Sequence, residues 1–553
     1  MKSDFHGLLS WPLAFAILFI AIPPFLFYSH PSSFWANTDY EPLGLGDALN
    51  LAYRIADFRI YPSVGMADHP GVPFYFMSWL ALALAGYPVA SRGPGFFGAV
   101  IDHVEDYHQA SVWLGELVGA AGVYILARTA RPLAPAGVVA IGLLAWLSST
   151  PATLLMFTTP SIESFAILVN GLFFYALVRI ALDRDFSRSV TVLAASVSAF
   201  AYLNKLPYIN VSLALAAAGI CSLVFGGAGL AVIRQRCVLF ALSSLGIILA
   251  VGCLVIGWSE FLHLLRFHRS IVFNSGLYGT GNQFVVSGHD LRQAIAAIPR
   301  ERAYVMLIAP LLGGAVAIGG FVTARRGPQH IPVAVICIGA GLASLASAIF
   351  VLKHYDLHYT AGVSATLPAS AVAGYLLVNS SGYRLGTAAA VLTTAAILLM
   401  AYETTPSLAS VLAARTHDSA LAAADLGDID AERAHDKRPI AFLYKTPFAW
   451  YGEGFVIFNA GVPRLKDEYL ASRRDMFRAS AAGLADRQVG AYVIDKTYFP
   501  TAESVRAAPN LTLLEPNPVR FENGDRLIEL RTAFLLVRPA AAGNDQPSSR
   551  PTD

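Results

Sequence analysis

The chain has 553 residues, of which 55% are hydrophobic and only 14% are charged. Soluble domains carry roughly a quarter charged residues. Long uncharged runs alternate with short charged clusters, a pattern typical of proteins that cross the membrane many times. The formal net charge of +2 is spread over loop ends, which excludes a nucleic-acid-binding class. The four cysteines lie in apolar runs without a CxxC pattern, which excludes a disulfide framework and a zinc ribbon.

Apolar runs of membrane-spanning length divide residues 1–402. The first, from Leu8 to Tyr28, is too long for the apolar region of a signal peptide, so we expect an uncleaved helix. A helix needs roughly 20 residues to cross the bilayer, and we predict about eleven spans. We expect two of them to be tilted helices that meet at a kink at Pro207. The predicted spans lie near 8–28, 109–128, 135–152, 161–180, 188–203, 207–226, 237–257, 303–322, 331–351, 360–379 and 386–402.

The orientation depends on segment 72–89, which is apolar enough to be a further span. Short cytoplasmic loops are enriched in Lys and Arg. If this segment does not cross, the basic clusters fall on the same side as Lys2; if it crosses, all of them change side. We therefore predict a helix in the outer interface, a cytoplasmic N-terminus, and periplasmic loops at 29–108 and 258–302. The clusters contain Arg128, Arg131, Arg184, Arg188, Arg234, Arg236, Arg325, Arg326 and Arg384.

The C-terminal part, residues 403–540, differs from the apolar part in its pattern. It contains the strand-like runs PIAFLYK, GAYVID and RLIELRTAFLLV, and helix-compatible stretches such as EYLASRRDMFRASAAGLA. This alternation predicts a small periplasmic α/β domain. Residues 541–553 have the composition of a disordered tail. The fold class is thus an all-α polytopic membrane bundle followed by a small soluble α/β domain.

Two acids in the first outer loop are candidates for catalysis. Asp39 and Asp47 follow the first span closely, where a lipid-linked substrate presents its phosphate. A carboxylate at this depth is suited to act as general base on an acceptor hydroxyl. The alternative is that both are ordinary loop acids, with Asp47 as the N-cap of the run ALNLAYRIADF.

Polar groups also flank the interfacial segment. Asp68 and His69 precede it, at a helix N-terminus where an anion binds favourably. Glu105, Asp106 and His108 stand close together before the second span and are weak candidates for a divalent-cation site. Prolines at any helix start explain the first group equally well, and a solvated loop explains the second.

Four further groups lie at the outer ends of later spans or next to them. Glu163 is an acid at the membrane edge, and Lys205 lies between two apolar runs, where a lysine snorkels or pairs with an anion. Arg266 and Arg269 belong to a basic stretch of the long outer loop that is suited to a lipid phosphate or to anionic headgroups. The last group supplies donors for phosphate oxygens or anchors an aromatic belt; it contains Lys353, His354, His358 and Tyr359.

In this order, the motifs resemble those of the GT-C superfamily of membrane glycosyltransferases, and most of all bacterial relatives of the protein O-mannosyltransferases and of the lipid A aminoarabinose transferase. TDYE matches the catalytic acid of the first outer loop at Asp39, with Asp47 second. DHPGVPFYFMSW, GVYILARTAR, TTPSIESF, NKLP and KHYDLHYTAGVSATLP match the later motifs. The chain departs from the family in lacking an Asp-Glu pair, and in carrying His69 where some members use Lys.

The resemblance implies a GT-C catalytic domain over residues 1–402 in a bacterial inner membrane. It implies an inverting transfer from a polyprenyl-phosphate-linked sugar to a glycan, lipid or protein of the cell envelope, with the phosphate stabilised by cations. No cofactor is certain, and a divalent cation stays possible. The alternatives are a transporter or flippase of a polyprenyl-linked or amphipathic substrate, and an assembly partner with a degenerate fold.

Overall fold

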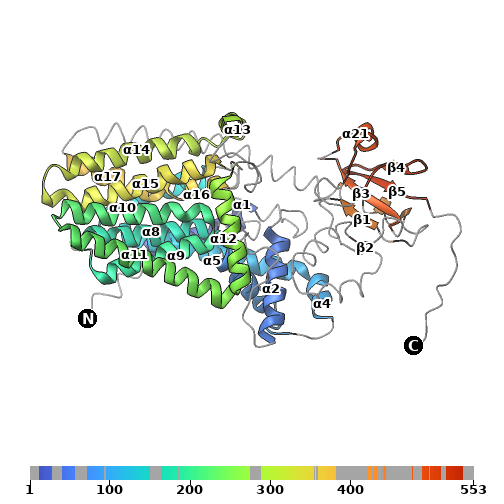
Figure 1. The fold of residues 1–553 in the computed structure, drawn as a ribbon, viewed down its shortest axis with the longest axis horizontal. Coiled ribbons are helices and arrows are strands. Elements are labelled where there is room, and N and C mark those ends of the chain that lie inside the picture. The colour runs from blue at the N-terminus through green and yellow to red at the C-terminus, as the bar shows by residue number, and fades with distance from the viewer. Residues whose placement is uncertain are drawn as a thin grey trace.

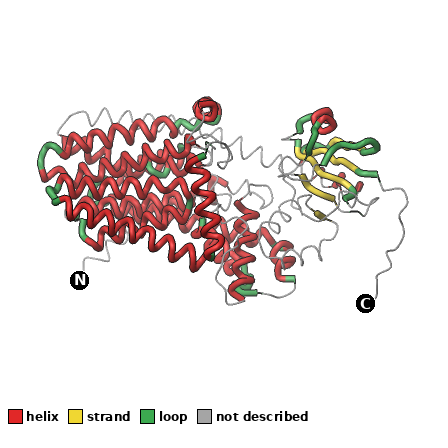
Figure 2. Tube along the Cα trace, viewed as in Figure 1, coloured by secondary structure: helices red, strands yellow, loops and turns green. Residues whose placement is uncertain are grey.

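The computed structural model describes most of the apolar part of the chain and portions of the C-terminal part. The described residues are 11–27, 40–56, 71–91, 95–149, 153, 164–183, 186–274, 288–353, 355, 359–381 and separate segments between 421 and 539. They form a bundle of long helices and a separate small sheet (Figures 1 and 2).

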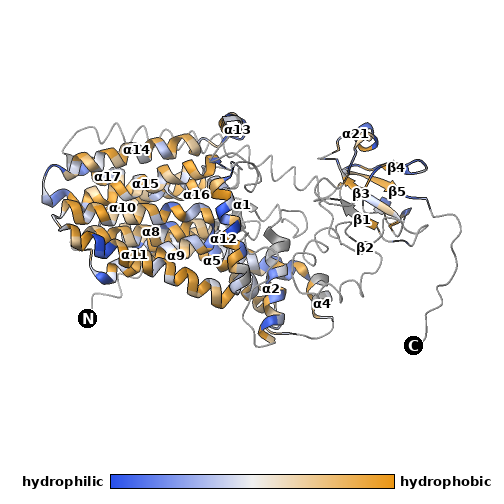
Figure 3. Ribbon diagram, in the orientation of Figure 1, coloured by the Kyte–Doolittle hydropathy of each residue, from blue (hydrophilic) through white to orange (hydrophobic). Residues whose placement is uncertain are grey.

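Seven helical segments of the described residues are long and apolar enough to cross a membrane. They are built from α5 (Val104–Ala130), α8 (Ser164–Leu182), α10 (Ile209–Phe225), α11 (Leu230–Val251), α14 (Val305–Ala324), α15 (Ile331–Lys353) and α16 (Thr360–Ser364) with α17 (Leu367–Ser381). Shorter helices in the bundle are α1 (Trp11–Phe27), α6 (Ala136–Leu147) and α9 (Arg188–Asn204). The long helices, mostly hydrophobic along their length (Figure 3), confirm a multi-pass membrane protein. The predicted span at 386–402 lies outside the described residues.

The bundle has two chemically different ends. The turns that follow α5 and α14 and the turn that precedes α9 lie at the same end, at the left of Figure 1. These turns carry Arg131, Arg188 and Arg325, and we call this end the arginine end. The opposite end carries α12 (Trp258–Phe273), which crosses the bundle, and we call it the α12 end. These three described arginines therefore lie at one end of the bundle, which is compatible with the predicted topology.

The helices α9 and α10 are joined by a 3-10 turn at Leu206–Tyr208. A Cβ on Gly219, late in α10, would lie 2.5 Å from the ring of Phe186, just before α9, so the two helices run antiparallel. The predicted kink at Pro207 is therefore a full reversal of the chain. The reason is that Lys205 has extended backbone angles, φ −164° and ψ 139°, which break the helix before Pro207.

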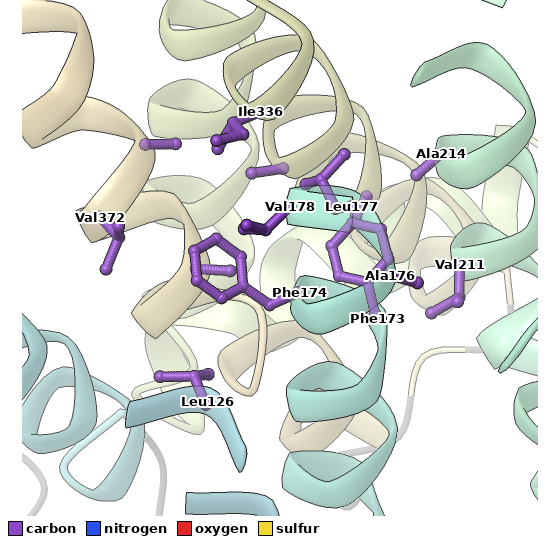
Figure 4. Close-up of a cluster of buried hydrophobic side chains, with 14 of the residues drawn as sticks. Leu126, Phe173, Phe174, Ala176, Leu177, Val178, Val211, Ala214, Ile336 and Val372 are labelled. Atoms are coloured by element: carbon purple, nitrogen blue, oxygen red, sulfur yellow. The ribbon is translucent and has the colours of Figure 1, made fainter. Parts of the chain in front are cut away.

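The core of the bundle is packed from buried side chains of many helices, part of which Figure 4 shows. Leu126 of α5, Phe174 of α8, Val211 of α10, Ile336 of α15 and Val372 of α17 are all buried there. Helices in a membrane are held together by close van der Waals packing, since lipid is as apolar as their side chains. The bundle therefore depends on complementary shape more than on hydrophobicity.

Glycines allow the closest helix contacts. A Cβ on Gly122 of α5 would lie 2.5 Å from the backbone nitrogen of Leu168 of α8. A Cβ on Gly313 of α14 would lie 2.7 Å from the carbonyl oxygen of Gly341 of α15, whereas one on Gly314 would meet nothing within 4 Å. Small residues at such crossings are typical of packed membrane helices.

Short helices gather at the α12 end: α2 (Tyr40–Ala56), α3 (Val72–Leu84), α4 (Phe96–Asp102) and α13 (Gly288–Arg300). The 13 residues of α3 span about 20 Å, which is too short to cross the bilayer. It packs on α2, α5 and α9 instead. This agrees with the prediction that segment 72–89 does not span the membrane.

The described parts of the predicted outer segment 258–302 form two helices, α12 and α13. In α12, Phe261, Leu264 and His268 are buried at helical spacing, whereas Arg266 and Arg269 are exposed. The helical spacing of these buried residues was overlooked in the sequence, because basic residues stand between them. The adjoining helix α13 packs against α15.

The C-terminal part contains a five-stranded sheet with the order β2-β1-β3-β5-β4. The strands β1, β2 and β3 are parallel, and β3, β5 and β4 are antiparallel. The predicted strand-like runs are confirmed, but RLIELRTAFLLV is a hairpin rather than one strand. The stretch predicted as helix contains β2. The bounds are β1 (Ile440–Leu443), β2 (Met476–Phe477), β3 (Ala491–Asp495), β4 (Arg526–Glu529) and β5 (Ala533–Val537), with α21 (Ala502–Ala507) after β3.

The turn of this hairpin is held by one buried carboxylate. Asp425 accepts hydrogen bonds from the backbone nitrogens of Arg531 (2.9 Å) and Thr532 (2.7 Å). It also accepts from the Thr532 hydroxyl at 2.7 Å and the Arg531 guanidinium at 3.1 Å. Burial raises the pKa of Asp425, but these bonds outweigh burial and hold the pKa below its ordinary value.

Candidate functional site

Lys205 lies at the break between α9 and α10, at the α12 end of the bundle. Its backbone nitrogen still donates to the carbonyl of Ala201 at 3.2 Å, and its carbonyl accepts from the nitrogen of Tyr208 at 3.0 Å. The residue is only 8% exposed. A lysine held in a helix break has a fixed backbone, and here its ammonium is directed into the protein.

The ammonium of Lys205 lies over the ring of Tyr359, with the Nζ atom 4.5 Å from the ring centroid. Tyr359 immediately precedes α16 and belongs to the late polar motif. Cation–π contacts contribute about 0.5–2 kcal/mol, more where water is excluded. The structure therefore joins two motifs that the sequence analysis assigned separately to phosphate binding.

The helix α12 is attached to the same region by two contacts. Tyr202, three residues before Lys205, shares a hydrogen bond of 2.8 Å with Nδ1 of His268. Near the C-terminal end of α12, the carbonyl of Val272 accepts a hydrogen bond from the ammonium of Lys353, the last residue of α15. Burial lowers the pKa of the His268 imidazole to about 4, so the ring is neutral at physiological pH.

The N-terminus of α3 closes on the same turn of α9. A Cβ on Gly71 would lie 1.8 Å from the carbonyl oxygen of Asn204 and 2.5 Å from that of Leu203. Gly71 belongs to the predicted DHPG motif, and its contact requires the absence of a side chain. Asp68 and His69, which precede it, lie outside the described residues.

Asp47 lies inside α2, which begins at Tyr40, so its interpretation as a helix N-cap or a loop acid is wrong. It is 2% exposed, and Asn50 beside it on the same helix is fully buried. The helix α2 packs on α3, whose first residue follows Gly71. The carboxylate of Asp47 is thus held in the protein interior, on the helix α2 that packs against α3.

The remaining predicted site residues are distributed as follows. Arg266 and Arg269 are exposed on α12, and Lys353 is half-buried at the end of α15. The structure does not describe Asp39, Asp68, His69, Glu163, His354 and His358.

The weak metal candidates lie in the first turns of α5. Glu105 and Asp106 are exposed, whereas His108 is buried. Among the residues that the structure describes, no three His, Cys, Asp or Glu side chains are grouped to hold a metal ion. The divalent cation stays a prediction.

Tyr202 was missed in the sequence, whereas Gly71, Asn204 and His268 belong to the predicted motifs or to the basic stretch without a separate role. The side chain of Asn204 is fully buried, and within the described part of the chain neither its oxygen nor its nitrogen has a hydrogen-bond partner. Its position beside Lys205 was the available signal, because two polar residues between apolar runs are unusual. Nothing in the sequence pairs Tyr202 with His268.

No protein-family model and no curated protein sequence matches the chain. The resemblance to GT-C glycosyltransferases therefore rests on the sequence motifs alone.

Proposed function

We propose that the chain is an inverting glycosyltransferase that takes a sugar from a polyprenyl-phosphate carrier at the α12 end of the bundle. The convergence at Lys205 is the observation that carries the proposal. The segments around Gly71, Tyr202, His268 and Tyr359 meet at the last turn of α9. In this proposal the arginine end faces the cytoplasm and the α12 end faces the periplasm, in agreement with the positive-inside rule.

The chemistry of the cluster suits a phosphate leaving group. Charge develops on the phosphate as the bond between the sugar and the carrier breaks, and a cation in a water-poor setting stabilises this charge strongly. Lys205 supplies such a cation, since it is 8% exposed. Arg266 and Arg269 on the exposed face of α12 are placed to attract the lipid phosphate as it approaches.

The base that removes the proton from the acceptor hydroxyl comes, in this proposal, from the first outer segment. Asp39 is the leading candidate on the motif, and Asp47 is the second. The burial of Asp47 in α2 makes it a stronger candidate than its sequence position indicated. The acceptor is a glycan, lipid or protein of the envelope, and the C-terminal α/β domain contributes to its binding.

The test uses the lipid-linked sugar that accumulates in a bacterial strain lacking this protein. The purified chain in detergent, supplied with this lipid and an envelope extract, is expected to release the sugar from its carrier. Lys205→Ala is expected to reduce the rate by about 10²–10³-fold, as for the loss of one transition-state donor. The matched control is Arg326→Ala at the arginine end, which is expected to keep the rate.

The detergent assay also separates the two classes of function. A flippase has no membrane to act across in detergent, so it releases no sugar there. If no lipid-linked sugar accumulates in the strain, or if the folded chain leaves it intact, the glycosyltransferase proposal is wrong. The transporter is then the better interpretation.

A further inference from the structure

A carboxylic acid lies inside the membrane bundle, apart from the site described above. Glu116 is the thirteenth residue of α5, about 18 Å from the start of this helix of 27 residues. It is 5% exposed, and its Oε2 atom is buried with no hydrogen-bond partner among the described residues. A short side chain at this depth cannot reach the headgroups as a long lysine does.

The helix turn that carries Glu116 is packed on two sides. A Cβ on Gly115 would lie 2.8 Å from the hydroxyl of Ser164 of α8, and one on Gly119 would lie 2.7 Å from the ring of Phe19 of α1. By contrast, Trp113 and Leu117 are 43% and 51% exposed on the lipid-facing side of α5. Glu116 therefore belongs to the interior face of the helix.

No cation neutralises this acid among the residues that the structure describes. The nearest basic groups along α5 are His108, about 12 Å away, and Arg128, about 18 Å away. On α8, Arg179 lies about 22 Å beyond Ser164. The helices α1, α3, α6 and α17, which also pack on α5, contain no Lys, Arg, His, Asp or Glu.

The other acids and the tyrosines on these elements complete the set of titratable groups. Glu105 and Asp106 are exposed at the start of α5, more than two turns from Glu116, and Asp102 ends the preceding helix α4. The tyrosines are neutral at physiological pH. They are Tyr75 of α3, Tyr107 and Tyr124 of α5, Tyr175 of α8 and Tyr375 of α17.

An isolated carboxylate in a low-dielectric interior is strongly unfavourable, and such a group takes up a proton instead. Two hydroxyls of the same region, those of Ser111 on α5 and Ser164 on α8, are also buried and have no partner among the described residues. Leaving a buried polar group without a hydrogen-bond partner costs about 1–3 kcal/mol of stability. Polar groups of this kind are satisfied when water enters.

We propose that Glu116 is a reversible proton-binding site in the membrane interior. Its carboxyl holds a proton in this conformation and exchanges it with water that reaches the polar stretch beside Ser111 and Ser164. This site is independent of the proposed sugar transfer, because Glu116 lies on α5 and its contacts do not include Lys205 or the residues around it.

The probe is dicyclohexylcarbodiimide, an apolar reagent for protonated carboxyl groups. The carboxyl proton passes to one carbodiimide nitrogen while the carboxyl oxygen bonds to the central carbon. The acyl group then migrates from oxygen to nitrogen, which gives a stable N-acylurea without a further reactant. The full chain is treated in lipid vesicles over a range of pH, and the adduct is located by peptide mass spectrometry.

We expect an adduct at Glu116 that declines as the pH rises, by about tenfold per unit once the carboxyl titrates. Glu116→Gln removes the adduct from this peptide, whereas Glu105→Gln, which changes an exposed acid of the same helix, does not. A water-soluble carbodiimide is expected to modify Glu105 and to spare Glu116. The proposal is overturned by the absence of an adduct at every pH, by a yield independent of pH, or by equal modification with the water-soluble reagent. None of these outcomes depends on whether the chain transfers a sugar.

Discussion

Gly71→Ala is the substitution that tests most directly whether the contact between α3 and α9 positions the site. The backbone angles of Gly71, φ −77° and ψ 167°, are open to alanine, so the backbone itself adds no strain. The obstacle is the Asn204 carbonyl oxygen, 1.8 Å from the new Cβ, where ordinary contacts begin at 3.4 Å. One side must therefore move by roughly 1.6 Å at the residue next to Lys205.

A displacement of this size has two consequences. Overpacking typically costs about 1–3 kcal/mol, so the protein is expected to melt earlier but to remain folded. A misplacement of 1 Å at a reacting centre costs about 10²-fold in rate, so release of the sugar is expected to fall by at least that factor.

The measurement combines the sugar-release rate with the melting temperature of the same detergent preparation. Gly98→Ala is the matched control, since a Cβ there would meet nothing within 4 Å. It is expected to leave both quantities unchanged. A Gly71→Ala protein with the wild-type rate and a lower melting temperature would show that this contact is only structural, and would refute its role in positioning Lys205.

The remaining predictions concern the base, the bundle and the C-terminal sheet. Asp39→Asn is expected to reduce sugar release by about 10²–10⁴-fold, the usual contribution of a general base, and a larger loss with Asp47→Asn would move this role to α2. Gly313→Leu is expected to destabilise the bundle by about 1–3 kcal/mol in a melting assay, whereas Gly314→Leu, with the same gain in hydropathy, is expected to be neutral; equal effects would contradict the helix contact. Asp425→Asn is expected to speed amide exchange in the β4–β5 turn by about 10²-fold at pH 7, for a loss of about 3 kcal/mol. Because the pKa of Asp425 is lowered on folding, the wild-type advantage is present above about pH 4 and disappears as the pH falls through the folded value; an advantage that persists in acid would refute this.

The sequence was most informative where polar residues interrupt apolar runs. Lys205 and Pro207 lie between two such runs, and the break between α9 and α10 is at this point. The arginines at loop ends likewise predicted which turns lie together. Both features follow from the cost of polar groups in hydrocarbon, which acts on each segment independently of the rest of the fold.

Features that depend on long-range packing were not predictable. The chain around Asp47 contains Gly44 and Gly46, which favour a loop in isolation, yet α2 runs through them. A Cβ on Gly44 would lie 2.8 Å from the ring of Phe74, so the packing of α2 on α3 requires a glycine there. Similarly, β2 at Met476–Phe477 exists by pairing with β1, although its local sequence is compatible with a helix.

The position of the Lys205 ammonium differs from that of a lysine that only anchors a helix at the membrane surface. A lysine that only snorkels extends its ammonium toward water and headgroups. Lys205 is instead 8% exposed, and its ammonium lies over the ring of Tyr359. Burial of an ammonium is costly unless an anion or a polar partner compensates for it. This ammonium lies at the turn where α3, α12 and the segment before α16 meet, a position that suits the proposed role in binding the phosphate of a lipid carrier.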